Sequence, residues 1–93
     1  MNKEEFKKQA HQTIEDVSAK MEKLKKKKDS AKGEALEKYE KSIKDLESKQ
    51  SELKTKYAEI ENASEEKLGE AKTAFSSASD SFKEGFEKIK TLF

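Results

Sequence analysis

Hydrophobic side chains recur every three or four residues along almost the whole chain, with charged residues between them. This spacing places the hydrophobic residues on one face of an α-helix and leaves the opposite face polar. The chain contains no proline, so no proline interrupts a helix. The pattern predicts an all-α fold of long amphipathic helices, packed as an antiparallel coiled-coil hairpin or as a three-helix bundle.

The pattern divides into three segments of similar length, at residues 3–29, 34–61 and 64–92. The first segment has a clear start, because Asn2 can cap it and Glu5, three residues later, completes a box-like pair. The three segments together form one helical domain that spans residues 1–93.

The surest break between helices is predicted at residues 62–64. Asn62 tolerates the left-handed conformation that ends many helices. Ser64 is a good N-cap, and Glu65 and Glu66 after it place negative charge in the first turn of the next helix.

A second weak point lies at residues 29–33. Asp29 and Ser30 favour caps and turns, and Gly33 weakens a helix. The hydrophobic spacing nevertheless keeps its phase from Lys28 into the next segment. The unbroken phase favours one continuous helix through Gly33, with a turn as the alternative.

The first two segments carry a heptad-like packing seam, the pattern that holds coiled coils together. The middle segment is the most regular, and Gln50 is a polar member of its seam that could set the register. The seam consists of Ile14, Val17, Met21, Leu24, Leu36, Tyr39, Ile43, Leu46, Leu53, Tyr57 and Ile60.

Composition limits the core that a single copy can build. Hydrophobic residues make up 31% of the 93 residues and charged residues 44%, and only twenty hydrophobic side chains are larger than alanine. A small domain with so little apolar surface is marginally stable on its own. Packing the seam against a second copy would bury more of it, so we predict a homo-oligomer.

The sharpest charge feature is a lysine run late in the first segment, which is a candidate anion patch. It consists of Lys20, Lys23, Lys25, Lys26, Lys27 and Lys28. Lysines contact the phosphates of anionic lipids and of nucleic acids. They also favour the C-terminal end of a helix, which is the simpler explanation. The chain has no arginine for bidentate base recognition, so nucleic acid is the weakest of these predicted partners.

The last segment carries a phenylalanine-rich face on a helix with many Ser and Thr residues. The face consists of Leu68, Phe75, Phe82, Phe86, Ile89 and Phe93. The simplest interpretation is a core face that packs on the first two segments. The alternatives are shallow insertion into a membrane surface and docking into the groove of a partner protein.

Residues for catalysis or metal binding are scarce. His11 is the only histidine, and with Glu15 it offers two metal ligands at most, which is too few for a typical site. The chain contains no cysteine, nucleophile–His–acid set or Gly-rich phosphate loop. We therefore expect no enzyme activity, cofactor, metal or small-molecule substrate.

Targeting signals are not evident in the sequence. Residues 1–12 lack the apolar stretch of a signal peptide. No apolar run approaches the ~20 residues of a membrane span. The expected location is cytoplasmic, with a cleaved signal as the alternative.

Three stretches of sequence resemble one family. They are the Lys/Glu-rich first part, the Tyr-Glu-Lys-x-Ile-x-x-Leu pattern of residues 39–46, and the Ala-Ser-Glu entry at residues 63–65. Together they resemble small bacterial coiled-coil proteins that carry a stress-response label. The resemblance implies a coiled-coil fold and a stress-linked role, and it supplies no catalytic residues.

These observations favour a non-enzymatic helical structural or interaction protein that self-associates. The first alternative is peripheral membrane binding through residues 64–93. The second is low-specificity polyanion binding through residues 20–28.

Overall fold

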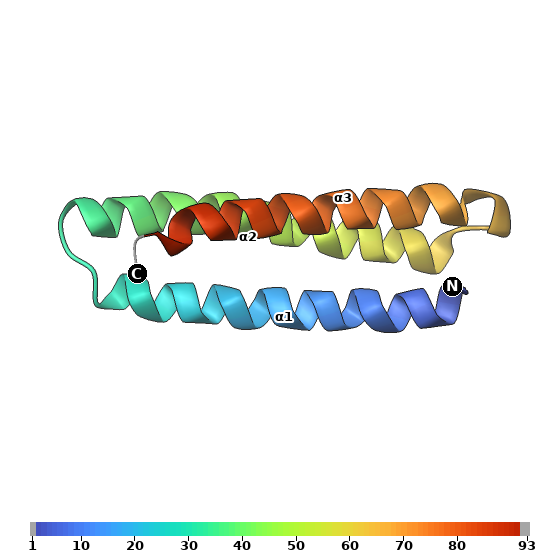
Figure 1. The fold of residues 1–93 in the computed structure, drawn as a ribbon, viewed down its shortest axis with the longest axis horizontal. Coiled ribbons are helices and arrows are strands. Elements are labelled where there is room, and N and C mark those ends of the chain that lie inside the picture. Colours follow the sequence, from blue (N-terminus) through green and yellow to red (C-terminus); the bar gives the residue numbers. More distant parts are fainter. Residues whose placement is uncertain (1, 92–93) are drawn as a thin grey trace.

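The protein is a rod of three α-helices in a computed structural model that describes residues 2–91. The helices are α1 (Lys3–Asp29), α2 (Glu34–Asn62) and α3 (Glu65–Lys90). Two short connections reverse the chain, so α2 runs antiparallel to both α1 and α3 (Figure 1). The rod measures 50 × 17 × 17 Å. The described residues contain no strand, and the predicted all-α fold is confirmed as a three-helix bundle.

The start of α1 follows the predicted capping pattern. The backbone amide of Glu5 donates to Asn2 Oδ1 at 2.9 Å, and Asn2 Nδ2 donates to Glu5 Oε1 at 3.4 Å. Asn2 has an extended backbone, as N-cap residues do. The cap satisfies one of the amides that a helix N-terminus leaves without a partner.

The chain turns at residues 30–33, so the continuous helix favoured by the phase of the pattern was wrong. Helix α1 ends at Asp29, and the amides of Ser30 and Ala31 close its last turn by donating to carbonyls of α1. Gly33 has a φ of 63°, a conformation that a residue with a Cβ adopts only under strain. The turn is favoured because it lets the hydrophobic faces of α1 and α2 bury each other within one chain.

The predicted break at residues 62–64 is present, but its local chemistry differs from the expectation. Asn62 is the last residue of α2, and Ala63 follows it in an extended conformation with φ of −72°. The Asn62 side chain donates back to the Ala58 carbonyl at 3.0 Å. Ser64 is the N-cap residue of α3, yet its side chain makes no cap hydrogen bond. The chain therefore reverses through extended residues, without a left-handed asparagine.

Helix α3 is slightly shorter than the predicted segment 64–92. Its last helical residue is Lys90, and the Thr91 hydroxyl donates to the Lys88 carbonyl at 2.9 Å. Leu92 and Phe93 lie outside the described residues.

The hydrophobic core runs along the axis of the rod and takes side chains from all three helices. Its most completely buried members are Phe82, Leu24, Leu46, Leu53 and Ile60. Helix α2 packs closely along both neighbours, whereas α1 and α3 meet at fewer positions. The hydrophobic faces of all three helices thus share one core.

Helix α3 approaches α2 closely at a glycine. A Cβ atom added to Gly85 would lie 2.9 Å from Cδ2 of Leu46 and 3.2 Å from Nζ of Lys49. Real Cβ atoms do not sit this close to a neighbour. On the neighbouring turn, Lys49 Nζ donates to the Ser81 carbonyl at 3.3 Å, which adds a polar contact between the two helices.

Candidate functional site

The predicted packing seam lies mostly inside the bundle. Its buried members are Val17, Met21, Leu24, Tyr39, Ile43, Leu46, Leu53 and Ile60. Ile14 and Tyr57 are half-buried and pack against this core. Leu36 is half-buried and lies in the first turn of α2, and its place in the seam stays a prediction.

Gln50 lies at the interface of α1 and α2, where the sequence predicts a polar seam residue. Its Nε2 atom donates to Ser18 Oγ at 3.2 Å, in a partly buried setting. Both residues are half-buried, so Gln50 is not the fully buried polar group of a coiled-coil seam. The pair nevertheless joins one position of α1 to one position of α2.

The phenylalanine-rich face of α3 lies in the core. Phe75, Phe82, Phe86 and Ile89 are each at most 5% exposed. The rings of Phe82 and Phe86 stack with centroids 6.2 Å apart, and the edge of Phe6 meets Phe75 at 6.1 Å. In the folded bundle these four side chains therefore belong to the shared core.

The predicted face has two further members. Leu68 is half-buried and packs against the edge of the core. Phe93 lies outside the described residues.

The lysines of the candidate anion patch on α1 differ in how far they are exposed. Lys20 is half-buried, and its ammonium lies 5.4 Å from the centroid of the Phe86 ring, so it joins α1 to α3. Lys25 Nζ lies 3.7 Å from Glu47 of α2. Lys28 is half-buried, whereas Lys23, Lys26 and Lys27 are exposed. The lysine run therefore partly serves the packing of α1.

The fold adds further lysines to the end of the rod where α1 ends and α2 begins. Figure 1 shows that the C-terminal end of α3 also lies there. We call this part, residues 23–41 and 85–91, the basic end. Five carboxylates lie in it, at Asp29, Glu34, Glu37, Glu40 and Glu87. Its ten lysines are Lys23, Lys25, Lys26, Lys27, Lys28, Lys32, Lys38, Lys41, Lys88 and Lys90.

The opposite end of the rod has no such excess of lysine. Residues 2–8 and 55–72 contain six lysines and seven glutamates. Some of these charges pair closely: Lys7 Nζ lies 3.9 Å from both Glu4 and Glu61. The near-zero net charge of the chain thus conceals a difference between its two ends. The sequence pattern does not show this difference, because lysines of α2 and α3 reach the end of α1 only when the three helices pack together.

A shallow hollow lies between α2 and α3 at the basic end. It has a volume of about 250 Å³ and is lined by Lys38, Ser42, Lys88, Ile89 and Thr91. The Ile89 side chain is 4% exposed, whereas both lysines are exposed. The hollow is therefore lined by two lysines and two hydroxyl-bearing residues and is open at the surface.

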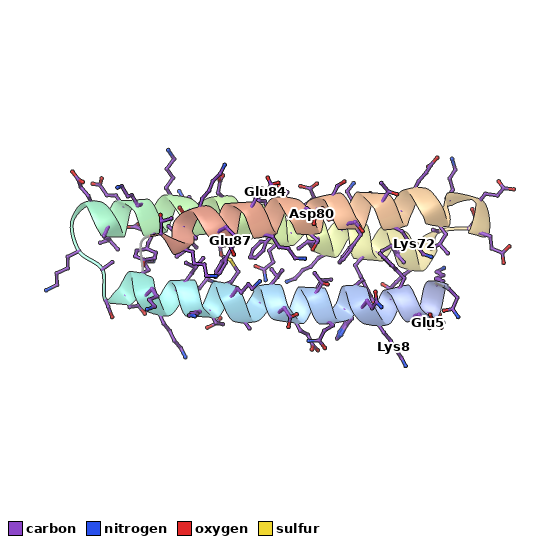
Figure 2. All side chains as sticks on the ribbon, in the orientation of Figure 1. Glu5, Lys8, Lys72, Asp80, Glu84 and Glu87 are labelled. Carbon is purple, nitrogen blue, oxygen red and sulfur yellow. The ribbon has the colours of Figure 1, made fainter. Side chains whose placement is uncertain are left out.

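A second hollow lies between α1 and α3, the two helices that pack least closely. It has a volume of about 180 Å³, and its lining includes Phe6, Phe75, Ser79 and Lys83. Lys72 covers the Phe6 ring from α3, with its Nζ 5.5 Å from the ring centroid (Figure 2). This second hollow is therefore lined by both aromatic and charged side chains.

The predicted two-ligand pair on α1 is present but exposed. His11 Nδ1 lies 3.5 Å from Glu15 Oε1, and both side chains are about 60% exposed. The imidazole ring also lies beside Tyr57 of α2, with centroids 6.3 Å apart. Within residues 2–91, no three His, Asp or Glu side chains gather closely enough to hold a metal ion.

None of the helices in the described part of the chain is long and apolar enough to cross a membrane. No family model matches the chain, and comparison with curated proteins and with solved structures finds no similar protein.

Proposed function

We propose that this chain is a non-enzymatic helical structural or interaction protein that works through its outer surface. The observation that supports this proposal is the use of the hydrophobic faces. All three helices direct them into one shared core, and the outward positions carry mainly Lys, Glu, Asp and Ser. Figure 2 illustrates this arrangement, with Lys8, Glu5 and Glu84 extending from the rod. A rod of this kind offers partners a rigid, patterned array of charges.

Self-association is part of the proposal, although through a different surface from the one first expected. The seam that suggested an oligomer is covered within a single chain, since Leu46 and Leu53 are each at most 1% exposed. Contacts between copies would therefore form through the outer faces of the helices. Such contacts would be polar and would weaken as salt concentration rises.

The stress-linked role stays a prediction of the resemblance alone. The Tyr-Glu-Lys-x-Ile-x-x-Leu pattern that carries it spans Tyr39, Ile43 and Leu46, which are core residues here. Core packing explains this spacing without reference to a cellular role.

Site-specific photo-crosslinking in living cells tests the proposal. A photo-reactive residue would replace Ala19, Ala58 or Ser77, which are exposed positions on α1, α2 and α3. We expect a discrete protein adduct from at least one of these faces, and none from a control at buried Leu53. An adduct of twice the chain mass identifies self-association. The absence of adducts from all three exposed positions would contradict the proposal.

Low-specificity polyanion binding is a second candidate, favoured by the basic end. The fold places Lys32, Lys38 and Lys88 at the same end of the rod as the exposed lysines of α1. Titration with duplex DNA near 50 mM salt tests low-specificity polyanion binding. Such binding is strongest at low salt because it is driven by the release of counterions.

Membrane binding through residues 64–93 would require α3 to leave the bundle. Release would expose Phe75, Phe82 and Phe86 together with the faces of α1 and α2 that they cover. This alternative predicts that the native core is lost when the protein binds a membrane. Flotation with vesicles therefore separates it from the other candidate functions.

A further inference from the structure

The basic end combines a local excess of positive charge with a narrow cross-section. Ten lysines and five carboxylates lie in this part of a rod that is 17 Å across. The Lys90 ammonium lies 3.5 Å from Glu87, and Lys25 pairs with Glu47. Lys26, Lys38 and Lys88, one from each helix, are exposed. This end of the rod therefore offers an anionic partner lysines from all three helices.

We propose that the basic end docks onto an anionic membrane surface, with a lipid phosphate in the hollow between α2 and α3. This inference rests on the polyanion candidate and names its ligand. Lys38, Lys88 and Ser42 line this hollow, which is open at the surface and has a volume of about 250 Å³. Lysine and hydroxyl side chains are donors that suit a phosphate group.

The chemistry of the basic end favours lipid headgroups over nucleic acid. Its cations are all lysines, which act as mobile point charges and suit a fluid layer of phosphates. Single-stranded nucleic acid is usually bound by bases stacking on exposed aromatic rings. In the described residues the aromatic side chains are buried or half-buried, including Tyr39 in this part of the rod.

An apolar residue at the same end points to the same partner. Leu36 is half-buried and lies one turn before Tyr39, in the first turn of α2. An apolar side chain among lysines gains free energy when it enters the boundary between headgroups and acyl chains. This contact would add to the electrostatic attraction without requiring the bundle to open.

Vesicle binding with two matched triple variants tests the inference. The first variant, K26Q/K38Q/K88Q, removes one exposed lysine from each helix at the basic end. The control, K8Q/K54Q/K67Q, removes one exposed lysine from each helix outside it and changes the net charge by the same amount. Each protein is titrated with phosphatidylcholine vesicles that do or do not contain one third phosphatidylserine, and circular dichroism checks the fold.

We expect wild-type protein to bind the anionic vesicles at low salt and not the neutral ones. The basic-end variant should bind on the order of a hundredfold more weakly, since each lysine near an anionic surface contributes several-fold. The control should stay within a few-fold of wild type, and the helical content of bound protein should match that of free protein.

Four other outcomes would overturn the inference. Equal weakening of the two variants would mean that net charge alone governs binding. Binding of duplex DNA without binding of vesicles would remove the membrane and leave the polyanion candidate standing. Binding of neither would remove both. Free inorganic phosphate that abolishes binding at low millimolar concentration would indicate a soluble ligand in place of a surface.

Discussion

Lys3 of α1 reaches the end of α2, where its Nζ donates to the main-chain carbonyl of Glu61 at 2.9 Å. The same ammonium donates to the Ala63 carbonyl at 3.1 Å. The last carbonyls of a helix lack partners within it, and a cation there is favoured by the helix dipole. The last turn of α2 contains no basic residue, so a different helix supplies this cation.

Replacing Lys3 with methionine should therefore lower the free energy of unfolding by about 1 kcal/mol. Methionine keeps most of the aliphatic length of lysine and removes the charge and the two hydrogen bonds. The matched control is Lys8→Met on an exposed position of the same helix, which should change stability by less than about 0.5 kcal/mol. Urea denaturation measures both values, and equal effects would show that the carbonyl contacts contribute nothing.

The two glycines of α3 should respond in opposite ways to alanine. A Cβ on Gly69 meets no atom within 4 Å, so Gly69→Ala should raise stability by about 0.5–1 kcal/mol through helix propensity. A Cβ on Gly85 would press on Leu46, which is 1% exposed and has little room to move. Gly85→Ala should lower stability by about 1 kcal/mol, because overpacking outweighs propensity. Thermal unfolding of the pair is the measurement, and a gain at Gly85 would mean that α2 and α3 can move apart.

Gly33 should be intolerant of any side chain for a reason unrelated to packing. Nothing lies within 4 Å of an added Cβ, but the φ of 63° strains every residue other than glycine. Gly33→Ala should therefore cost about 1 kcal/mol, although alanine is the better helix former. Unfolding followed by circular dichroism gives the value. A stabilising effect would favour the continuous helix that the phase of the pattern suggests.

Charges placed in the core should unfold all three helices together. Leu46 and Phe82 are at most 1% exposed and belong to one cluster. Phe82→Ala should cost about 3–5 kcal/mol, and Leu46→Lys and Phe82→Glu should each abolish folding. Circular dichroism should show loss of helix in α2 as well as α3, with Ser77→Ala as an exposed control on α3. Survival of a folded α1–α2 hairpin in the Phe82→Glu variant would refute a single shared core.

The polar contact between Gln50 and Ser18 should appear as energetic coupling. A double-mutant cycle with Gln50→Ala and Ser18→Ala should give a coupling of about 0.5–1 kcal/mol, as expected for a partly buried hydrogen bond. Additive effects of the two substitutions would mean that this pair does not help to align α1 with α2.

Most of the architecture could be predicted because it depends on local patterns. Period-3.6 spacing identified the helices, and the Asn2–Glu5 cap lies where the short-range signal placed it. The spacing of hydrophobic residues did not reveal the turn at residues 30–33. Two antiparallel helices joined by a short turn can show the same unbroken three-to-four-residue spacing as one continuous helix. The energetic advantage of that turn is burial against a distant segment, which is not visible in a local window.

The candidate sites were predicted less completely, for a similar reason. The lysine run on α1 is visible in the sequence as consecutive lysines, but Lys38 and Lys88 come to the same end of the rod only when the three helices pack together. Lys20 belonged to the predicted patch and instead lies over the Phe86 ring. A helical pattern shows which face a lysine occupies, and it does not show which helix covers that face.

The sequence by itself determined that this protein is helical, where its first helix starts and which face of each helix is hydrophobic. These properties follow from spacing, capping residues and helix propensity, which act over a few residues. The tertiary structure decided that the phenylalanine face of α3 is interior, that Lys3 caps α2, and that lysines from three helices share one end of the rod. These three features depend on which distant segments pack together and exclude water. That packing is set by the interactions of all three helices and not by any short stretch of sequence.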